Sequence, residues 1–246
     1  YNANMRHGLA AVLAALTLLI PAIGRSADGA VPLRVAVAAN FRQTLEQLLP
    51  LYKQRSGVDV KITSASTGIL SAQIQRGAPF DVFLAADKAR PASLAESDLA
   101  VAGSIECYAV GTLMVLGVDS LDELRSPKER VAIANPRFAP YGKAAVEAIS
   151  ELGDGGNPRE KLVFGTNVQQ AFQFYESGAA DIASVASSIG NGDGVPVPTS
   201  FHSPIEQHGL ALARSTVPET ATGFLEFLRS DDAIDIMRGS GYQPCS

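Results

Sequence analysis

The sequence predicts an α/β protein of two lobes, each a mainly parallel sheet flanked by helices, with a ligand cleft between the lobes. Three observations lead to this fold class. Apolar runs of strand length alternate with segments whose apolar residues recur at helical spacing, and this alternation occurs twice along the chain. Nothing between the two series resembles a long flexible linker. The chain has 246 residues, 46% of them hydrophobic, which is enough to enclose a sizeable core.

The first series begins with a short apolar segment, LRVAVAA at residues 33–39, which is expected to form a buried strand. Apolar residues then recur at helical spacing from Phe41 to Tyr52, and Gly57 ends that helix. The remaining predicted elements of this series are an alternating strand (58–65), a short helix that ends at Gly77, and a buried strand (80–87). Parallel strands joined by helices in this way have helices on both faces of their sheet.

The second series repeats the plan after residue 107. Its predicted elements are strands at 108–117, 130–135, 161–165 and 180–187, helices at 141–153 and 168–178, a Gly-, Ser- and Pro-rich loop with a short edge strand at 187–200, a strand at 208–215, and helices at 217–230 and 231–241. We therefore predict one lobe from residues 31–107 and 208–246 and a second from residues 108–207, joined by strands that cross near Cys107 and His208.

Residues 1–30 stand apart from both series. From Met5 a basic start is followed by an apolar run from Leu9 to Ile20, and then by Pro21 and small residues. The run is too short to span a bilayer comfortably, and no cluster of charges ends it. We expect a secretory signal peptide, and hence a mature protein in the periplasm.

The sequence contains two cysteines, Cys107 and Cys245. An oxidising compartment would allow them to form a disulfide between the middle of the chain and its end. The sequence leaves this pairing open, because it does not show whether the two Cα atoms approach within bonding range.

The charge balance and the motifs argue against several classes of function. The formal net charge is −5 and no run of Lys and Arg offsets it, so nucleic acid is not expected as a partner. There is no HExxH, CxxC or G-x-S-x-G motif, and YGKAA at residues 141–145 has Ala144 where a P-loop needs Ser or Thr. We interpret His202 and His208 as surface or hinge residues and Asp81 as a turn or capping group, so no catalytic site is expected.

Polar residues stand at the points where predicted strands give way to helices. They are Asn40 after the first strand, Ser66 and Thr67 after the second, and Tyr141 with Gly142 and Asn167 with Val168 in the second series. A helix start offers unpaired backbone N–H groups and a partial positive charge, which suit an anion. Helix capping explains Asn, Ser and Thr at any single junction equally well. A shared anion site requires the junctions of both lobes to meet in the cleft.

Several stretches resemble the periplasmic molybdate-binding proteins of ABC importers. They are VAVAANF (35–41), ASTGILSAQIQRGAPFDVFLAAD (65–87), IANPRFAPYGKAAVEAISELG (133–153), NVQQAFQFYESGAADIA (167–183) and FLEFLRSDDAIDIMRGSGY (224–242). The resemblance covers most of the chain from Val31 to Tyr242, in the family's order and spacing. It implies a two-lobed periplasmic binding protein (type II-like) that closes over an oxyanion.

The resemblance also implies which residues bind the oxyanion. The positions that match the family's donors are Asn40, Thr67 with Ser66 beside it, Tyr141 and Val168. The first two donate from side chains in the family, and the last two donate a backbone N–H. Ala39 and Gly142 lie beside these positions and are weaker candidates. Some members use a Tyr hydroxyl for a further contact, and Ala186, which has no donor, stands at about that position here.

The function that the resemblance implies is capture of molybdate or tungstate and delivery to an inner-membrane ABC permease. It implies a monomer that is not an enzyme, needs no cofactor and binds no metal directly, because molybdenum arrives as an oxyanion. Donor groups without acceptors suit a fully ionised tetrahedral dianion. Two alternatives remain: a receptor for another ligand, such as sulfate, thiosulfate or a metal chelate, and a secreted hydrolase that uses the cleft.

Overall fold

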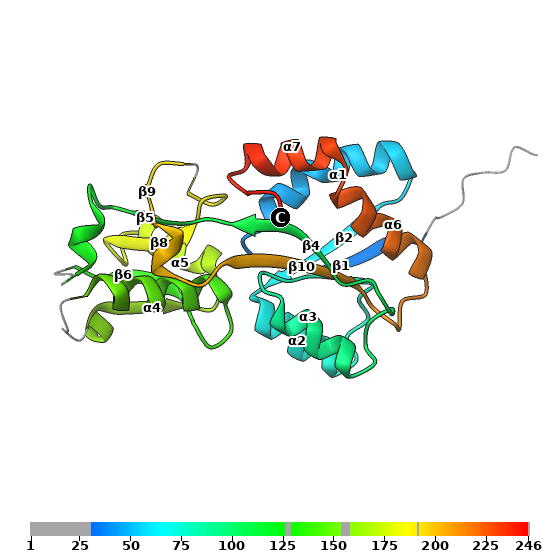
Figure 1. Cartoon of the computed structure of the whole chain (residues 1–246), viewed down its shortest axis with the longest axis horizontal. Coiled ribbons are helices and arrows are strands. Elements are labelled where there is room, and N and C mark those ends of the chain that lie inside the picture. Colours follow the sequence, from blue (N-terminus) through cyan, green and yellow to red (C-terminus); the bar gives the residue numbers. More distant parts are fainter. Residues whose placement is uncertain (1–30, 126–128, 154–157, 191, 246) are drawn as a thin grey trace, which may run out of the picture.

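The structure is a computed structural model that describes residues 31–125, 129–153, 158–190 and 192–245. Figure 1 shows two bodies side by side, and each contains a five-stranded sheet with helices packed against it. The predicted fold class, a two-lobed α/β protein, is confirmed. The predicted signal peptide at residues 1–30 lies outside the described residues.

The first lobe is built on a sheet with the strand order β2-β1-β3-β10-β4. Its strands are β1 (Leu33–Ala38), β2 (Val60–Ala65), β3 (Val82–Leu84), β4 (Glu106–Gly111) and β10 (Ile205–Ala211). Helices α1 (Arg42–Ser56), α6 (Pro218–Leu228) and α7 (Asp231–Gly239) cover one face, and α2 (Thr67–Gln75) and α3 (Ala89–Glu96) cover the other, as Figure 1 shows. The apolar side chains of β1 are buried because helices cover both faces.

The second lobe has the strand order β7-β6-β8-β5-β9. Its strands are β5 (Leu113–Leu116), β6 (Val131–Ala134), β7 (Leu162–Gly165), β8 (Ile182–Ala186) and β9 (Val195–Pro196), and its helices are α4 (Pro140–Leu152) and α5 (Val168–Glu176). Short 3₁₀ helices lie at Leu121–Leu124, Pro158–Lys161 and Thr199–Phe201. In this lobe β5 runs opposite to the other described strands, and in the first lobe β10 does so, which leaves each sheet mainly parallel as predicted.

Within the described ranges the chain crosses between the lobes at two places. At the first, β4 leads through Thr112 into β5, so the apolar run predicted as one strand is divided between the two sheets. Gly111 stands at this crossing because a Cβ there would lie 2.0 Å from the Tyr141 hydroxyl. At the second, the chain returns from β9 to β10. The predicted lobe boundaries at residues 107 and 208 therefore fall inside β4 and β10.

Helix α3 is not among the elements that the sequence pattern predicts. Its Pro91 lies in the first turn, where a missing N–H removes no intrahelical hydrogen bond. Asp87 precedes the helix, and its Oδ1 accepts a hydrogen bond from the Arg90 N–H at 3.0 Å. Asp87 thus caps α3, the kind of role that the sequence interpretation gave to Asp81.

Asp81 has a different role, which corrects that interpretation. Its carboxylate is fully buried and accepts hydrogen bonds from Arg34, at 2.9 Å from Nε, 2.8 Å from Nη2 and 2.8 Å from the backbone N–H. The Ser215 hydroxyl donates to it as well, at 2.8 Å. Burial raises the pKa of Asp81, but these hydrogen bonds outweigh burial and hold the pKa below its usual value. The pair joins β1 to the start of β3.

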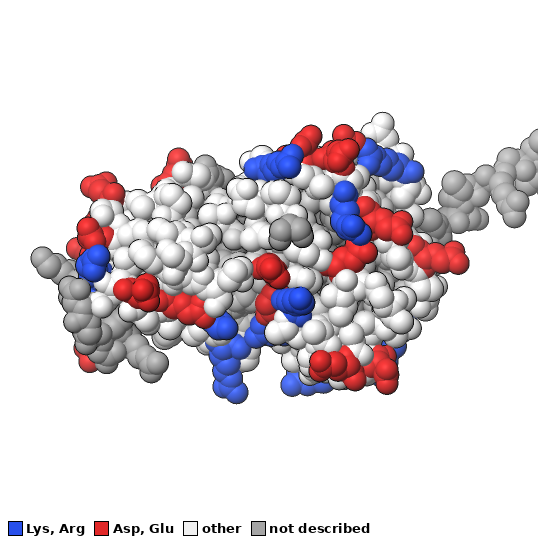
Figure 2. Space-filling view, viewed as in Figure 1, with Lys and Arg blue, Asp and Glu red and all other residues white. Residues whose placement is uncertain are grey.

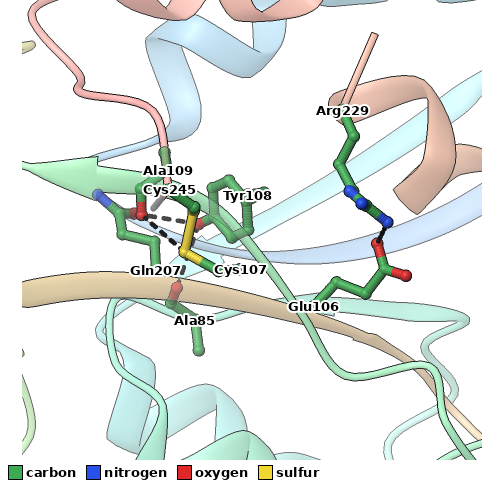
Figure 3. The surroundings of a disulfide bond; sticks show 8 residues. All are labelled: Ala85, Glu106, Cys107, Tyr108, Ala109, Gln207, Arg229 and Cys245. Atoms are coloured by element: carbon green, nitrogen blue, oxygen red, sulfur yellow. Dashed lines mark hydrogen bonds and ion pairs between the residues drawn. A yellow bond between two sulfur atoms is a disulfide. The ribbon is translucent and has the colours of Figure 1, made fainter.

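A disulfide ties the end of the chain to the first lobe. Cys107 in β4 is bonded to Cys245, and their Cα atoms are 6.1 Å apart. Figure 3 shows this bond beside Tyr108 and Gln207. The backbones of Val110 and Gln243 also pair, with both N–H···O distances at 2.8 Å. The C-terminal segment is therefore held against β4 at the crossing between the lobes.

We expect the variant Cys107→Ala/Cys245→Ala to lose about 2–5 kcal/mol of unfolding free energy, because the disulfide restricts the unfolded chain over a long loop. Urea unfolding of the variant and of the oxidised wild type measures this loss. Wild-type protein treated with a reducing agent serves as the control and should match the variant. Equal stability of all three samples would contradict the expectation.

We expect the Asp81→Asn variant to be less stable than wild type at neutral pH by about 1–3 kcal/mol, because Arg34 loses its charged acceptor. A lowered folded-state pKa contributes stability above the unfolded pKa of about 3.9, and that stability is lost as the pH falls through the folded pKa. The gap between wild type and Asp81→Asn should therefore shrink below about pH 4. Urea unfolding over a pH series measures this difference in unfolding free energy. Glu96→Gln, at an exposed position, is the control. A difference that stays constant with pH would contradict a lowered pKa of Asp81 in the folded state.

Candidate functional site

A small cavity lies where the two lobes meet, and we call it the donor cavity. Its volume is about 10 Å³. Its lining residues are Ala38, Ala39, Asn40, Ser66, Thr67, Ala86, Ala139, Pro140, Tyr141, Asn167 and Val168. The structure thus brings together in one place the five residues that the sequence predicted, Asn40, Ser66, Thr67, Tyr141 and Val168. They come from both lobes and from strand-to-helix junctions far apart in the chain.

The first lobe contributes two hydroxyl groups at the start of α2. The Ser66 hydroxyl is buried and has no hydrogen-bond partner among the described residues. Thr67 Oγ1 accepts a hydrogen bond from the Ala86 N–H at 3.1 Å, which leaves its own proton free to donate. Ser66 does not cap the helix through its side chain, so capping does not account for its hydroxyl. Two O–H donors are therefore available at this wall.

The second lobe contributes the starts of two helices. Tyr141 is the second residue of α4, after Pro140, and Val168 is the first residue of α5. Backbone N–H groups at such positions have no acceptor within their own helix. Asn167, in contrast, is a helix cap, because its Oδ1 accepts a hydrogen bond from the Gln170 N–H at 3.0 Å. Capping thus accounts for the side chain of Asn167. It does not provide an acceptor for the backbone N–H groups of Tyr141 and Val168.

The donor cavity presents donors and carries no charged side chain on its lining. Among the described residues, none accepts a hydrogen bond from the backbone N–H of Asn40, Ser66, Thr67, Tyr141 or Val168. The positive ends of α2, α4 and α5 meet there, and each carries a partial positive charge. All five residues are nearly fully buried, so water screens these dipoles little. The arrangement suits an anion that needs several donors.

The side chain of Asn40 forms hydrogen bonds within the protein. Its Nδ2 donates to Gln207 Oε1 at 2.8 Å and to the Tyr242 hydroxyl at 3.0 Å. An amide nitrogen has two hydrogens, so both are used. In this conformation only the backbone N–H of Asn40 is free to donate, and side-chain donation from Asn40 to a ligand stays a prediction.

Asn40 instead belongs to a buried hydrogen-bond cluster that we call the hinge network. Its members are Asn40, Tyr108, Tyr141, Ser188, Gln207 and Tyr242. Gln207 Oε1 also accepts from the Tyr108 hydroxyl at 3.0 Å, and Gln207 Nε2 lies 3.4 Å from the Tyr141 hydroxyl. Figure 3 shows Tyr108 and Gln207 directed toward each other.

The hinge network connects the lobes through the carbonyl oxygen of Asn40. The Tyr242 hydroxyl donates to it at 2.9 Å and the Ser188 hydroxyl at 3.0 Å. Ser188 follows β8 in the second lobe, so this bond crosses between the lobes. Burial raises the pKa of Tyr242 to about 12 against the hydrogen bonds that lower it, so its hydroxyl stays protonated at neutral pH.

The sequence reasoning missed four members of this network, Tyr108, Ser188, Gln207 and Tyr242. Gln207 is the most instructive, because it is fully buried although it is a polar residue in a strand. A buried amide requires partners, but the sequence does not show which residues face it. The pairing of β10 with β4 shifts register between Gln207 and His208, a local feature that no sequence pattern announces.

The three weaker candidates have different positions. Ala39 lines the donor cavity, whereas Gly142 and Ala186 do not. A Cβ on Gly142 would lie 2.0 Å from the Ala134 carbonyl oxygen, so this glycine lets α4 pack against β6. The Ala186 carbonyl accepts from the Ile189 N–H at 2.9 Å and forms a turn at the end of β8. Gly142 thus serves helix packing, and Ala186 forms part of a turn.

His202 and His208 lie outside the donor cavity. His202 follows a 3₁₀ helix and its Nδ1 lies 2.8 Å from the Ser203 carbonyl oxygen. His208 lies in β10, and burial lowers its pKa. Within the described residues, no group of His, Cys, Asp and Glu side chains is arranged to hold a metal ion.

The surface and the helices add two observations. Figure 2 shows Lys and Arg interspersed with Asp and Glu on the face in view, without an extended basic area. Of the helices in the described ranges, none has both the length and the apolar character to cross a bilayer.

Two lobes that enclose a buried set of donors define a solute-binding protein of the two-lobed α/β class. A family model described as "Bacterial extracellular solute-binding protein" matches residues 33–243. The molybdate-binding protein ModA of Rhodobacter capsulatus is 36% identical over 249 residues, which covers 97% of this chain and 96% of that protein. ModA of Azotobacter vinelandii is 34% identical and the match covers 92% and 97%. The chain therefore belongs to the bacterial extracellular solute-binding protein family.

Solved structures support the same fold. The Azotobacter vinelandii periplasmic molybdate-binding protein matches with a TM-score of 0.80 and 32% identity, over 87% of this chain and 100% of that one. The sulfate-binding protein SubI of Mycobacterium tuberculosis H37Rv matches with a TM-score of 0.72 over 88% of each chain. Its sequence identity is only 15%, so this second likeness concerns the fold alone.

We expect Gln207→Met to lower the unfolding free energy by about 1–3 kcal/mol, because Asn40 and Tyr108 lose a buried acceptor. Methionine has nearly the same length, so the loss reports hydrogen bonds more than packing. Urea unfolding measures it, and Gln43→Met, at an exposed position of α1, is the matched control. A Gln207→Met protein as stable as the control would show that the hinge network contributes nothing to stability.

Proposed function

We propose that this chain is a periplasmic receptor that binds molybdate or tungstate between its lobes and delivers it to the membrane permease of an ABC importer. The observation that carries the proposal is the donor cavity, where buried donors from both lobes converge and no charged side chain lies on the lining. The relatives named as molybdate-binding proteins, which match nearly the whole chain, support the choice of ligand.

The chemistry of the cavity favours a fully ionised tetrahedral dianion. Every oxygen of such an ion accepts hydrogen bonds and none donates, so donor groups satisfy it completely. A protonated phosphate brings an O–H that needs an acceptor, and an unsatisfied buried O–H costs about 1–3 kcal/mol. Aligned dipoles hold the ion in place of a counter-charge, because the closed cavity is buried and each dipole is fixed within its own lobe.

We assign one role to each predicted residue. Ser66 and Thr67 donate through their hydroxyl groups from the first lobe, and Tyr141 and Val168 donate backbone N–H groups from the second. Asn40 contributes its backbone N–H, while its side chain holds the hinge network in place. Because the donors are divided between the lobes, the ligand completes its contacts only when the lobes are closed, which couples binding to closure.

The remaining parts of the proposal follow from this role. A closed, liganded receptor differs in shape from an open one, and a permease can select the closed form. We propose that the chain acts as a monomer, that it needs no cofactor, and that it carries out no catalytic step, since the cleft holds no paired nucleophile and base among the lining residues.

A thermal-shift titration with molybdate, tungstate, sulfate and phosphate tests the ligand. Ligand at a thousand times Kd should add about 4 kcal/mol of stability. We expect large shifts with molybdate and tungstate and little with phosphate. A shift with sulfate would favour the alternative that the chain is a receptor for another oxyanion. Discrimination between sulfate and molybdate depends on the size of the cavity. The absence of a shift with both molybdate and tungstate would refute the proposed ligand.

Variants of the two hydroxyl donors test the site. We expect Ser66→Ala and Thr67→Val each to weaken molybdate binding by roughly 5- to 150-fold, which corresponds to the loss of about 1–3 kcal/mol. Isothermal titration calorimetry measures the affinities. The control is Ser150→Ala, an exposed serine of α4 whose hydroxyl donates to the Val146 carbonyl at 2.8 Å. Wild-type affinity in both site variants would mean that the donors lie elsewhere.

A further inference from the structure

A second, larger cleft lies directly outside the donor cavity, and we call it the outer cleft. It has a volume of about 570 Å³ and runs between the lobes. Ala86, Ala139 and Pro140 line both spaces, so the two adjoin. The charged residues on the wall of the outer cleft are Asp87, Arg90, Lys143 and Glu147. Next to these shared lining residues, one contact joins the two lobes.

That contact joins the lobes by a backbone hydrogen bond. The Gly68 N–H, in the first turn of α2, donates to the Phe138 carbonyl oxygen of the second lobe at 2.8 Å. A Cβ on Gly68 would lie 3.0 Å from that same oxygen and 3.1 Å from Nη2 of Arg90. The Phe138 carbonyl of the second lobe and the Arg90 guanidinium of the first are therefore packed closely around Gly68, which follows Thr67 of the donor cavity.

Arg90 reinforces this contact with a second bond between the lobes. It lies in α3 of the first lobe, and its Nη2 donates to the Arg137 carbonyl oxygen of the second lobe at 3.3 Å. Its Nη1 forms an ion pair with Asp87, and its backbone N–H donates to the same carboxylate. Asp87 thus holds the guanidinium in place, so little side-chain entropy is lost when Arg90 reaches across.

The acceptor on the second lobe is equally well fixed. The turn that carries Arg137 and Phe138 is closed by hydrogen bonds from the N–H groups of Phe138 and Ala139 to the Asn135 carbonyl, at 3.1 and 2.9 Å. The Arg137 N–H donates to Asn135 Oδ1 at 3.0 Å. Both carbonyls that face the first lobe therefore point outward from a rigid turn.

We propose that Arg90 is a latch that holds the lobes closed over the donor cavity and sets the rate at which the ligand leaves. This rests on the proposed function for the identity of the ligand. Separating the lobes must break the bonds from Arg90 and Gly68 to the second lobe, whereas the Arg90–Asp87 pair lies within one lobe and survives. The Arg90–Arg137 bond therefore stabilises only the closed state, so its loss raises the release rate.

Two substitutions separate a latch from a simple attraction between charges. Arg90→Gln removes the charge and shortens the side chain. Arg90→Lys keeps the charge, but an ammonium group does not contact Asp87 and the Arg137 carbonyl together. We expect both to release bound molybdate about tenfold faster than wild type. Radioactive molybdate chased with excess unlabelled molybdate measures the release rate. The control is Arg229→Gln, which breaks an exposed ion pair with Glu106 on the first lobe.

Amide hydrogen exchange gives a readout that does not depend on the ligand. The Gly68 N–H is protected by its bond to the other lobe, so its exchange rate in the free protein reports opening. We expect faster exchange at Gly68 in both Arg90 variants, with unchanged exchange in β1, which excludes general destabilisation.

Release and Gly68 exchange equal to wild type in Arg90→Gln would overturn the latch. So would an Arg90→Lys protein that matches wild type while Arg90→Gln only associates more slowly, because charge alone would then explain Arg90. If wild-type protein fails to retain molybdate, the proposed ligand is refuted, and the exchange at Gly68 still decides whether Arg90 is a latch.

Discussion

The rest of the structure depends on the hydrogen bonds of the buried Gln207 side-chain amide, which lies where the chain crosses between the lobes. This side chain is fully buried in β10, and a buried amide without partners is costly. Its partners Asn40 and Tyr108 come from the first lobe, and Tyr141 comes from the second. The same Asn40 that satisfies Gln207 stands on the wall of the donor cavity. The hinge network therefore sets the position of that wall. A change in geometry at the crossing between the lobes changes the geometry of the donor cavity.

Recognition by dipoles follows from the same arrangement. The donors of the cavity are backbone N–H groups and hydroxyls whose positions are set by helix starts, and helix starts are set by the strands that precede them. A charged side chain would provide a stronger attraction but would bind any anion and would retain it after opening. Neutral donors divided between two lobes lose most of their effect when the lobes part, because water then competes for each of them. This suits a protein that must bind an ion and then release it.

The sequence predicted the alternation of strands and helices and the junctions that line the cavity, because both depend on local pattern. The parts that it did not predict depend on contacts between distant residues. Asn40 looks like a ligand-binding amide at its junction, and only its contact with Gln207, 167 positions away, shows that its hydrogens are already used. The apolar run at residues 108–117 looks like one strand because nothing in its pattern reveals that Thr112 passes from one sheet to the other. Helix α3 was missed because Pro91 interrupts the helical pattern of the sequence, although in the structure it lies in the first turn, where proline is tolerated.

The C-terminal segment shows why the end of the chain matters to a site that it does not line. Tyr242 packs its ring against Phe41 at a centroid distance of 5.4 Å and donates its hydroxyl to the Asn40 carbonyl. Three residues later, Cys245 is bonded to Cys107 on the strand that leads to the crossing. The disulfide therefore fixes the segment that presents Tyr242, and Tyr242 in turn supports the loop that carries Asn40. Because Ser188 of the second lobe shares the same carbonyl acceptor, this segment also helps to set the angle at which the lobes close.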